Sequence, residues 1–277
     1  MTKLSDSVLG RRPSQNLYHY TTQTGFLGIV TSKSLWASKV HYMNDATEFA
    51  HAIGIAKSVI ESRASNGSND RVRLLDELRK RLDSVSKTHM FVACLSEAGD
   101  LLSQWRGYCS GGNGFSIGFS PERLLPVLSR QGFGIAACVY DSGEQYRLLE
   151  ELVDDAIEAI SRSVSHEEVL GTFISRFLRI GPLLKHPLFS EEKEWRILCG
   201  IIATDDARFQ IRGGKSMLVP YCEVNLCDQL GTMHVEDLII GPTPSPELSA
   251  ASATNLLSRY GVAWINCGPS KVPYRLW

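Results

Sequence analysis

The sequence lacks several features that would place it in a specialised class of protein. Its 277 residues include no run of about 18 apolar residues, so we expect no membrane-spanning helix. The first residues are polar, with Arg11 and Arg12 and no apolar segment, which argues against a signal peptide. Lysine and arginine number 29 and aspartate and glutamate 30, so the net charge is −1. This balance disfavours a broad nucleic-acid or anionic-lipid surface, although a local basic groove stays open.

Closely spaced cysteine pairs are also scarce. The seven cysteines are an odd number and are scattered along the chain. In a chain of this length without a signal segment, we expect reduced thiols and a cytoplasmic protein. Cys222 and Cys227 are the one close pair, and no second pair follows to complete a zinc knuckle. We therefore expect no structural metal.

The familiar catalytic signatures are missing as well. The sequence has no phosphate-binding P-loop, no GxGxxG after a strand, no HExxH and no GxSxG. The stretch Gly111-Gly112-Asn113-Gly114 fits a hairpin turn better than a phosphate cradle. Function must therefore be inferred from clusters of polar residues.

The order of apolar patterns predicts an α+β fold. Helices and strands are interspersed without strict alternation, which favours a central mixed sheet with peripheral helices. We divide the chain into a flexible tail over 1–15 and a single domain over 16–277, with a helical insert at about 144–180 that breaks near Ser165. The predicted strands are 17–20, 35–38, 89–96, 115–119, 134–140, 194–202, 216–225, 235–240 and 262–266. The other predicted helices are 25–31, 46–63, 71–87, 100–109, and those that open at Ser120-Pro121 and Ser245-Pro246.

Two clusters of polar and aromatic residues accompany predicted strands. The first is Tyr18-His19-Tyr20-Thr21, a histidine in a short aromatic strand. This histidine is either a satisfied core residue or a donor to the hydroxyls of a ligand. The second is Cys94-Leu95-Ser96-Glu97 with the helix after it, where Trp105 and Tyr108 share a face. That face belongs either to the core or to a stacking wall for a flat ring.

A third cluster is Glu191-Glu192-Lys193-Glu194-Trp195-Arg196. If a strand runs through it, Glu192, Glu194 and Arg196 share one side. The simple interpretation is a solvated strand end with an arginine pair, and the functional one is a pair of carboxylates facing a ligand. A further group, Asn44-Asp45-x-x-Glu48, either caps a helix or fixes a loop beside that ligand.

The succession of these motifs resembles a bacterial family of unknown function, the domain-of-unknown-function 2971 family (DUF2971). The resemblance spans about residues 17–242 in one order. It is carried by Leu17-Tyr18-His19-Tyr20-Thr21, Leu35-Trp36-Ala37-Ser38, Asn44-Asp45-x-x-Glu48, Cys94-x-Ser96-Glu97, Trp105-x-x-Tyr108, Gly114-Phe115-x-Ile117-Gly118-Phe119, Glu192-x-Glu194-Trp195-Arg196 and Ile239-Ile240-Gly241. The family name implies no activity.

The chain also resembles, more distantly, the ADP-ribosyltransferase-like enzymes. Those enzymes place a His or Arg on a first strand, a Ser, Thr or Tyr on a middle strand and a Glu, often in E-x-E, on a later one. The matching residues here are His19 with Thr21, Ser96, and Glu192-x-Glu194, although the middle motif is not the usual Ser-Thr-Ser and the helical insert is large.

This second resemblance implies NAD as substrate and a set of roles. Glu194 stabilises the positive charge that builds on the ribose as nicotinamide leaves, Ser96 orients Glu194, and Glu192 completes the catalytic set. Arg106 or Arg196 meets the diphosphate, and Trp105 or Tyr108 stacks on nicotinamide. The expected NAD-binding residues are His19, Tyr20, Thr21, Ser38, Trp105, Arg106, Tyr108 and Arg196.

The function expected from this resemblance is cleavage of NAD and transfer of ADP-ribose to an unknown acceptor, without a metal. One alternative is a non-catalytic nucleotide or small-molecule sensor of a bacterial stress or defence system. Another is a metal-dependent phosphoester hydrolase that uses Asp45, Glu48, Glu192 and Glu194. A structural or interaction protein without a ligand is a fourth interpretation.

Overall fold

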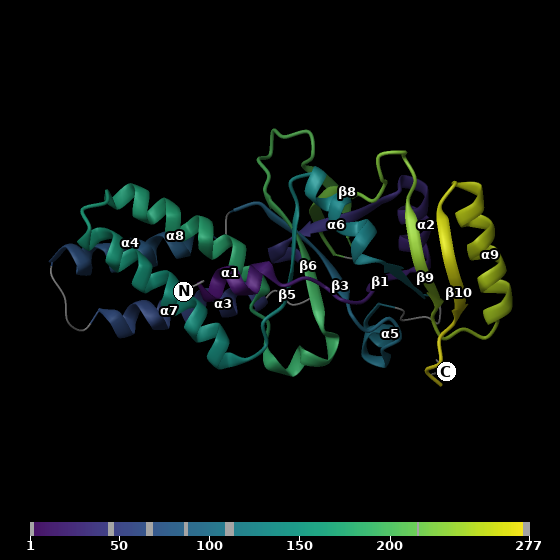
Figure 1. The fold of residues 1–277 in the computed structure, drawn as a ribbon, viewed down its shortest axis with the longest axis horizontal. Helices are drawn as coiled ribbons and strands as arrows, with labels where there is room; N and C mark the ends of the chain where they lie inside the picture. Colours follow the sequence, from purple (N-terminus) through teal and green to yellow (C-terminus); the bar gives the residue numbers. More distant parts are fainter. Residues whose placement is uncertain are drawn as a thin grey trace.

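The structure, a computed structural model, describes residues 3–43, 47–64, 69–85, 88–108, 114–214 and 216–273. A mixed sheet lies at its centre, with helices on both sides (Figure 1). This is the predicted α+β architecture. None of the helices in these ranges is long and apolar enough to cross a membrane.

The strand order places the candidate residues on neighbouring strands. The main path through the sheet is β10-β9-β4-β1-β3-β2-β8-β7, and β6 joins through β3 and carries β5 on its other side. All pairings are antiparallel except β9 with β10. The strands are β1 Leu17–Thr22, β2 Ser34–Lys39, β3 Met90–Ser96, β4 Gly114–Phe119, β5 Gly134–Ala137, β6 Glu194–Ile201, β7 Gln210–Gly213, β8 Leu218–Asn225, β9 His234–Ile240 and β10 Ala263–Pro269.

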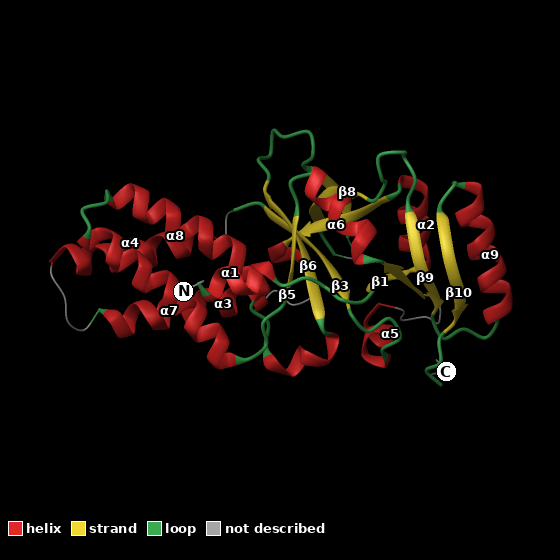
Figure 2. Ribbon diagram, viewed as in Figure 1, coloured by secondary structure: helices red, strands yellow, loops and turns green. Residues whose placement is uncertain are grey.

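The helices form two groups on opposite sides of this sheet (Figure 2). One group is a bundle of α1, α3, α4, α7 and α8, and the other consists of α2, α6 and α9, with the short α5 near the lower end of β1 and β3. Their bounds are α1 Leu4–Gly10, α2 Gln23–Ser32, α3 Thr47–Arg63, α4 Asn69–Val85, α5 Leu102–Tyr108, α6 Pro121–Arg130, α7 Ser142–Ser161, α8 His166–Ile180 and α9 Pro246–Arg259.

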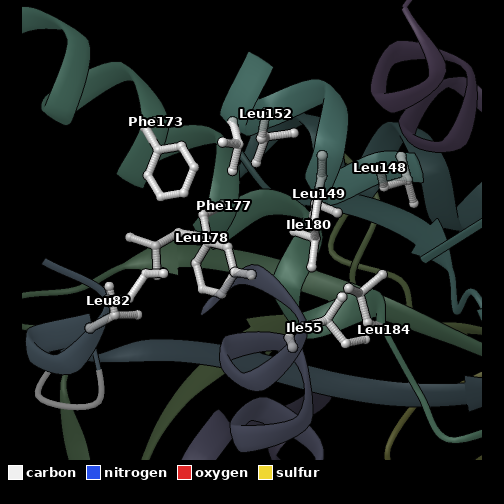
Figure 3. Packing of buried hydrophobic residues seen from close by; sticks show 14 of the residues in the cluster. Ile55, Leu82, Leu148, Leu149, Leu152, Phe173, Phe177, Leu178, Ile180 and Leu184 are labelled. Atoms are coloured by element: carbon white, nitrogen blue, oxygen red, sulfur yellow. The ribbon is translucent and has the colours of Figure 1, made fainter. Parts of the chain in front are cut away.

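Two apolar clusters bind these groups to the sheet. The bundle packs around Phe173 and Phe177 of α8 and reaches Met90 and Val92 of β3 (Figure 3). The opposite face of β3, which carries Phe91, Ala93 and Leu95, packs with α2, α6 and α9. Side chains alternate along β3, so its even-numbered residues face the bundle and its odd-numbered ones the other core. Ser96 and Cys94 therefore continue the bundle side of the strand.

Most of the predicted elements are confirmed. The stripe of Leu74, Leu75, Leu78, Leu82 and Val85 is buried along α4, as its helical spacing requires. The helical insert is α7 followed by α8, and the hydroxyl of Ser165 accepts from Glu168 N to cap the second helix. Thr22 likewise caps α2 by accepting from Gly25 N.

The N-terminal segment differs from the expected tail. Residues Leu4–Gly10 form α1, whose Val8 is fully buried. The backbone N–H of Leu4 and the hydroxyl of Ser5 donate to Glu151 of α7, at 2.7 and 2.5 Å. A seven-residue helix offers too little periodicity to be recognised from sequence, and its stability comes from this docking. Strand β5 is also shorter than predicted, and β7 was not predicted.

Candidate functional site

A pocket of about 350 Å³ opens where the ends of β1, β3 and β6 meet helix α5 and the segment before β6. Six of the predicted site residues line it: His19, Tyr20, Ser96, Tyr108, Glu192 and Glu194. The structure adds nine others: Tyr18, Met43, Cys94, Leu95, Ser103, Gln104, Gly107, Lys185 and Phe189. The pocket therefore combines two carboxylates, a lysine, a histidine and aromatic walls.

Strand register aligns three of the motifs found in the sequence. Ser96 of β3 is the register partner of Tyr18 on β1 and of Glu194 on β6. Directly paired residues in a sheet place their side chains on the same face. The first, middle and last motifs thus meet at one edge of the sheet, although about 180 residues separate His19 from Glu194 in the chain.

Glu194 lies at the buried end of this pocket, between two cations. Arg196 Nε donates to Glu194 Oε1 at 2.7 Å, and Lys185 Nζ donates to Glu194 Oε2. Burial alone would raise the pKa of Glu194, but the charges of Arg196 and Lys185 and their hydrogen bonds outweigh it and lower the pKa to about 2. The Cys94 thiol also donates to this carboxylate, which leaves Glu194 ionised at any physiological pH.

Lys185 joins the two glutamates. Its Nζ donates to Glu192 Oε2 at 2.5 Å as well as to Glu194, and it lies 5.1 Å from the ring centroid of Phe189. The Glu192 side chain is 22% exposed against 5% for Glu194, so Glu192 is the carboxylate that faces the opening. The turn between them depends on Lys193, which adopts a left-handed backbone with φ 42°.

The backbone of Lys185 is held by the helical insert. Its N–H donates to Val139 O at 3.1 Å, and Gln145 of α7 donates to its carbonyl at 2.7 Å. Gln145 is fully buried, so its amide satisfies carbonyls that would otherwise lie unpaired in the core. The insert thereby positions the lysine that pairs with the carboxylates of both Glu192 and Glu194.

Ser96 acts differently from the expectation. Its hydroxyl donates to the backbone carbonyl of Glu192 at 2.6 Å and accepts from Ala98 N at 3.0 Å. It therefore fixes the backbone before Glu194, and its hydroxyl forms no hydrogen bond with the Glu194 carboxylate. Tyr140 complements it, because its hydroxyl accepts from Glu194 N at 2.9 Å.

The sequence left His19 as either a satisfied core residue or a donor to a ligand, and the structure shows one of its ring nitrogens hydrogen-bonded to the protein. Its Nδ1 lies 2.9 Å from the carbonyl oxygen of Cys94, which can only accept, so Nδ1 carries the proton. Burial lowers the pKa of His19 despite this hydrogen bond, so the ring is neutral at pH 7. The other nitrogen, Nε2, is left as an acceptor for a ligand hydroxyl.

The aromatic residues divide between wall and core. Tyr108 lines the pocket, whereas Trp105 is fully buried, packs edge-on against Tyr20 and donates from Nε1 to Asp100 at 2.7 Å. Trp105 is therefore a core residue, and of the two aromatic residues predicted as alternatives for stacking on nicotinamide only Tyr108 lines the pocket. Tyr20 touches the pocket with its ring, since its hydroxyl donates to Ala98 O and accepts from Leu101 N.

Four further predicted residues do not line the pocket. Arg196 has no solvent exposure and is held by Glu194 and Pro182 O, so it cannot meet a diphosphate directly. Ser38 lies on β2 and accepts from Arg212 at 3.2 Å. Thr21 is buried away from the lining, and Arg106 is exposed outside it. Asn44 and Asp45 lie outside the described residues, as does the side chain of Glu48.

Sequence patterns missed Lys185 for a physical reason. It follows the end of α8 in a segment with neither helical nor strand periodicity, so nothing tied it to the glutamates. A lysine directly after the apolar residues 180–184 was nevertheless a signal, because a lysine is buried only when it is paired. Cys94 could have been inferred from its alternation with Ser96.

Metal ligands do not cluster in the described part of the chain. No group of three His, Cys, Asp or Glu side chains there could hold an ion. Between Glu192 and Glu194, Lys185 occupies the position that a cation would take. The cysteines at 94, 138, 199, 222, 227 and 267 are free thiols.

Comparison with known proteins gives one match. Residues 104–197 match the model of a family described as "Protein of unknown function (DUF2971)", which supports the predicted relationship over that segment. The matched span includes Tyr108, Lys185, Glu192 and Glu194. Searches of curated proteins and of solved structures found no match.

Proposed function

We propose that the protein is an ADP-ribosyltransferase-like enzyme that binds the nicotinamide–ribose end of NAD in this pocket. The observation that carries the proposal is the convergence of His19, Ser96 and the Glu192–Glu194 pair around one cavity. These are the residue types, in the strand order, that the resemblance requires. The proposal keeps NAD as substrate and leaves the acceptor of ADP-ribose open.

The chemistry needs a carboxylate beside the ribose. The bond between ribose C1′ and the nicotinamide nitrogen breaks, and its electron pair leaves with nicotinamide. An acceptor nucleophile then bonds to C1′ and releases its proton to a base. Positive charge develops on the ribose in between, and an ionised carboxylate stabilises it.

The hydrogen bonds favour Glu192 for this contact and leave Glu194 in a positioning role. Each oxygen of Glu194 already accepts from a cation, and Glu192 is the more exposed of the two carboxylates. Glu194 and Arg196 would then fix Lys185, which in turn holds Glu192. This assignment moves the ribose contact, which the sequence suggested for Glu194, to Glu192.

Other groups of the pocket fit the rest of the ligand. The neutral His19 would accept from a ribose hydroxyl through Nε2. Tyr108 and Phe189 supply aromatic surface for the nicotinamide ring. Lys185 is the one cation that lines the pocket among the described residues, so the diphosphate would compete with Glu192 for it. Such competition would release Glu192 for the ribose.

The test compares two neighbouring glutamates. Glu192→Gln removes the substrate-facing carboxylate, and Glu191→Gln is the matched control because Glu191 is exposed and does not line the pocket. Nicotinamide release from NAD is measured by chromatography, and binding by thermal stability with and without NAD. We expect release to fall about 100-fold or more in Glu192→Gln alone. Saturation at 100 times the dissociation constant should stabilise both variants by about 2.7 kcal/mol.

One observation favours a second candidate, a module that binds the nucleotide without turnover. Lys185 already pairs with Glu192, and a carboxylate paired with a cation stabilises developing positive charge less well. Stabilisation by NAD or ADP-ribose without nicotinamide release would support this candidate against catalysis. If neither ligand stabilises the protein, both proposals fail.

A further inference from the structure

A second cavity, of about 610 Å³, lies at the other end of β3 and β6, away from the site described above. Its floor on the sheet is lined by the apolar side chains of Met90, Ala136 and Leu198, and its walls by Leu178 of α8 and Leu9 of α1. The size is within the range of about 300–1,000 Å³ that is usual for small-molecule sites. We call this cavity the apolar groove.

Two glycines within regular elements keep the groove open. Gly171 lies in the middle of α8 and Gly134 on β5, where glycine costs about 0.5–1 kcal/mol relative to alanine. A Cβ added at either position would meet no heavy atom within 4 Å. Packing against neighbouring residues therefore does not explain these glycines, and a larger side chain at either position would narrow the groove that they line.

The only charges on the described lining are positive. Arg12 and Arg179 border the groove, and no lining residue is acidic. Neither guanidinium group forms a hydrogen bond or ion pair with a described residue. Their neighbours behave differently, since Arg11 pairs with Glu144 and Arg176 with Glu151. The chain thus satisfies the adjacent arginines and leaves the two at the groove available to an anion.

We propose that the apolar groove binds a single-chain amphipathic anion, with its hydrocarbon body against β5, β6 and α8 and its carboxylate at Arg12 and Arg179. An apolar floor with a cationic border matches a fatty-acid-type ligand in both parts. A neutral hydrocarbon would form no ion pair with the two arginines, and a phosphate without a hydrocarbon chain would not contact the apolar floor. The proposal does not depend on NAD or on the residues of the first pocket.

The first test measures binding of dodecanoate below its micelle concentration by calorimetry. Each added methylene between octanoate and dodecanoate should tighten binding about fourfold, since the buried area grows with the chain. Replacing dodecanoate by dodecanol should weaken binding about tenfold or more, because the charge-assisted hydrogen bonds are lost. Equal affinity for the acid and the alcohol would overturn the assignment of the head group.

The second test fills the groove. Gly171→Leu puts a side chain into the open space and raises helix propensity, so we expect the fold to persist and dodecanoate binding to be lost. Gly54→Leu is the matched control, because Gly54 lies in the interior of α3 with equally open surroundings outside the groove. Unfolding temperatures of both variants show whether the fold is intact.

The third test addresses the charge at the groove. Arg179→Met should weaken dodecanoate binding about tenfold, whereas Arg79→Met on α4, an exposed arginine outside the groove, should not. Binding that survives both Gly171→Leu and Arg179→Met would overturn the proposal. A second outcome would also overturn it. If the unmodified protein binds no dodecanoate but self-associates, and Gly171→Leu abolishes this self-association, the groove is occupied by a second copy of the chain.

Discussion

Arg196 lies beneath Glu194 with no solvent exposure and donates to its carboxylate through Nε, 2.7 Å from Oε1. Both residues face the same side of β6, two positions apart. The buried guanidinium has a further acceptor in Pro182 O. This ion pair is therefore part of the core and a support for the pocket at the same time.

Removing one partner of this pair should cost far more stability than removing both. Glu194→Gln leaves the buried Arg196 without its carboxylate and should lower the free energy of unfolding by about 3–5 kcal/mol. Arg196→Met should cost less, because Lys185 still pairs with Glu194. The double variant should lose less than the sum of the two. Urea unfolding of the four proteins at pH 7 measures this coupling. Strictly additive losses would contradict a direct ion pair.

The same carboxylate should make stability fall in acid. Because its pKa is lowered from 4.5 to about 2 in the folded protein, the unfolded state binds the proton more readily. The contribution of Glu194 is complete above about pH 4.5 and is lost as the pH falls towards 2, with a total on the order of 3 kcal/mol. Urea unfolding between pH 6 and 3 should show a shallower decline in Glu194→Gln than in the unmodified protein. Glu191→Gln should not change the slope.

Three histidines should also make stability fall in acid, and their effect should begin at a higher pH than that of Glu194. Burial lowers the pKa of His19, His41 and His89 below 6.5, with an added contribution from Lys39 at His41 and His89. For each, the unfolded chain takes up the proton first, so stability falls as the pH drops below about 6.5.

His41 offers the sharpest test of this histidine effect. Both of its ring nitrogens are buried and have no hydrogen-bond partner among the residues that the structure describes, and its ring packs edge-on against Phe49. His41→Phe should therefore raise stability by about 1 kcal/mol at pH 7 and more at pH 5.5. Thermal unfolding at the two pH values measures the difference. A pH-independent loss of stability would show that the imidazole has a partner in solution.

The sequence predicts regular elements well because their signals are local. The leucine stripe of α4 and the cap at Ser165 lie within a few residues of the backbone that they specify. Six of the eleven predicted site residues line one pocket because strand ends collect polar side chains at a common edge. The polar residues at these strand ends could be inferred from the alternation of apolar and polar residues along each strand.

The contacts that decide the roles are not local. Trp105 and Tyr108 lie on the same face of α5, yet Trp105 is a core residue and Tyr108 lines the pocket. What distinguishes them is the packing of Trp105 against Tyr20 and its hydrogen bond to Asp100. The backbone carbonyl of Lys185 accepts a hydrogen bond from Gln145, which lies forty residues earlier in the chain. This contact positions the lysine whose side chain pairs with both glutamates. Neither relationship has a pattern that one sequence can reveal.

Trp105 and Tyr108 should therefore respond differently to substitution. Trp105→Phe removes the hydrogen bond to Asp100 and part of a fully buried ring, so stability should fall by about 1–3 kcal/mol. Its NAD affinity should stay unchanged, because the side chain does not line the pocket. Tyr108→Leu removes a wall of the pocket and should weaken NAD binding about tenfold with a smaller loss of stability. Calorimetry at a temperature where every variant is folded separates the two effects. If Trp105→Phe weakened NAD binding as much as Tyr108→Leu, the tryptophan would contact the ligand and its assignment to the core would be wrong.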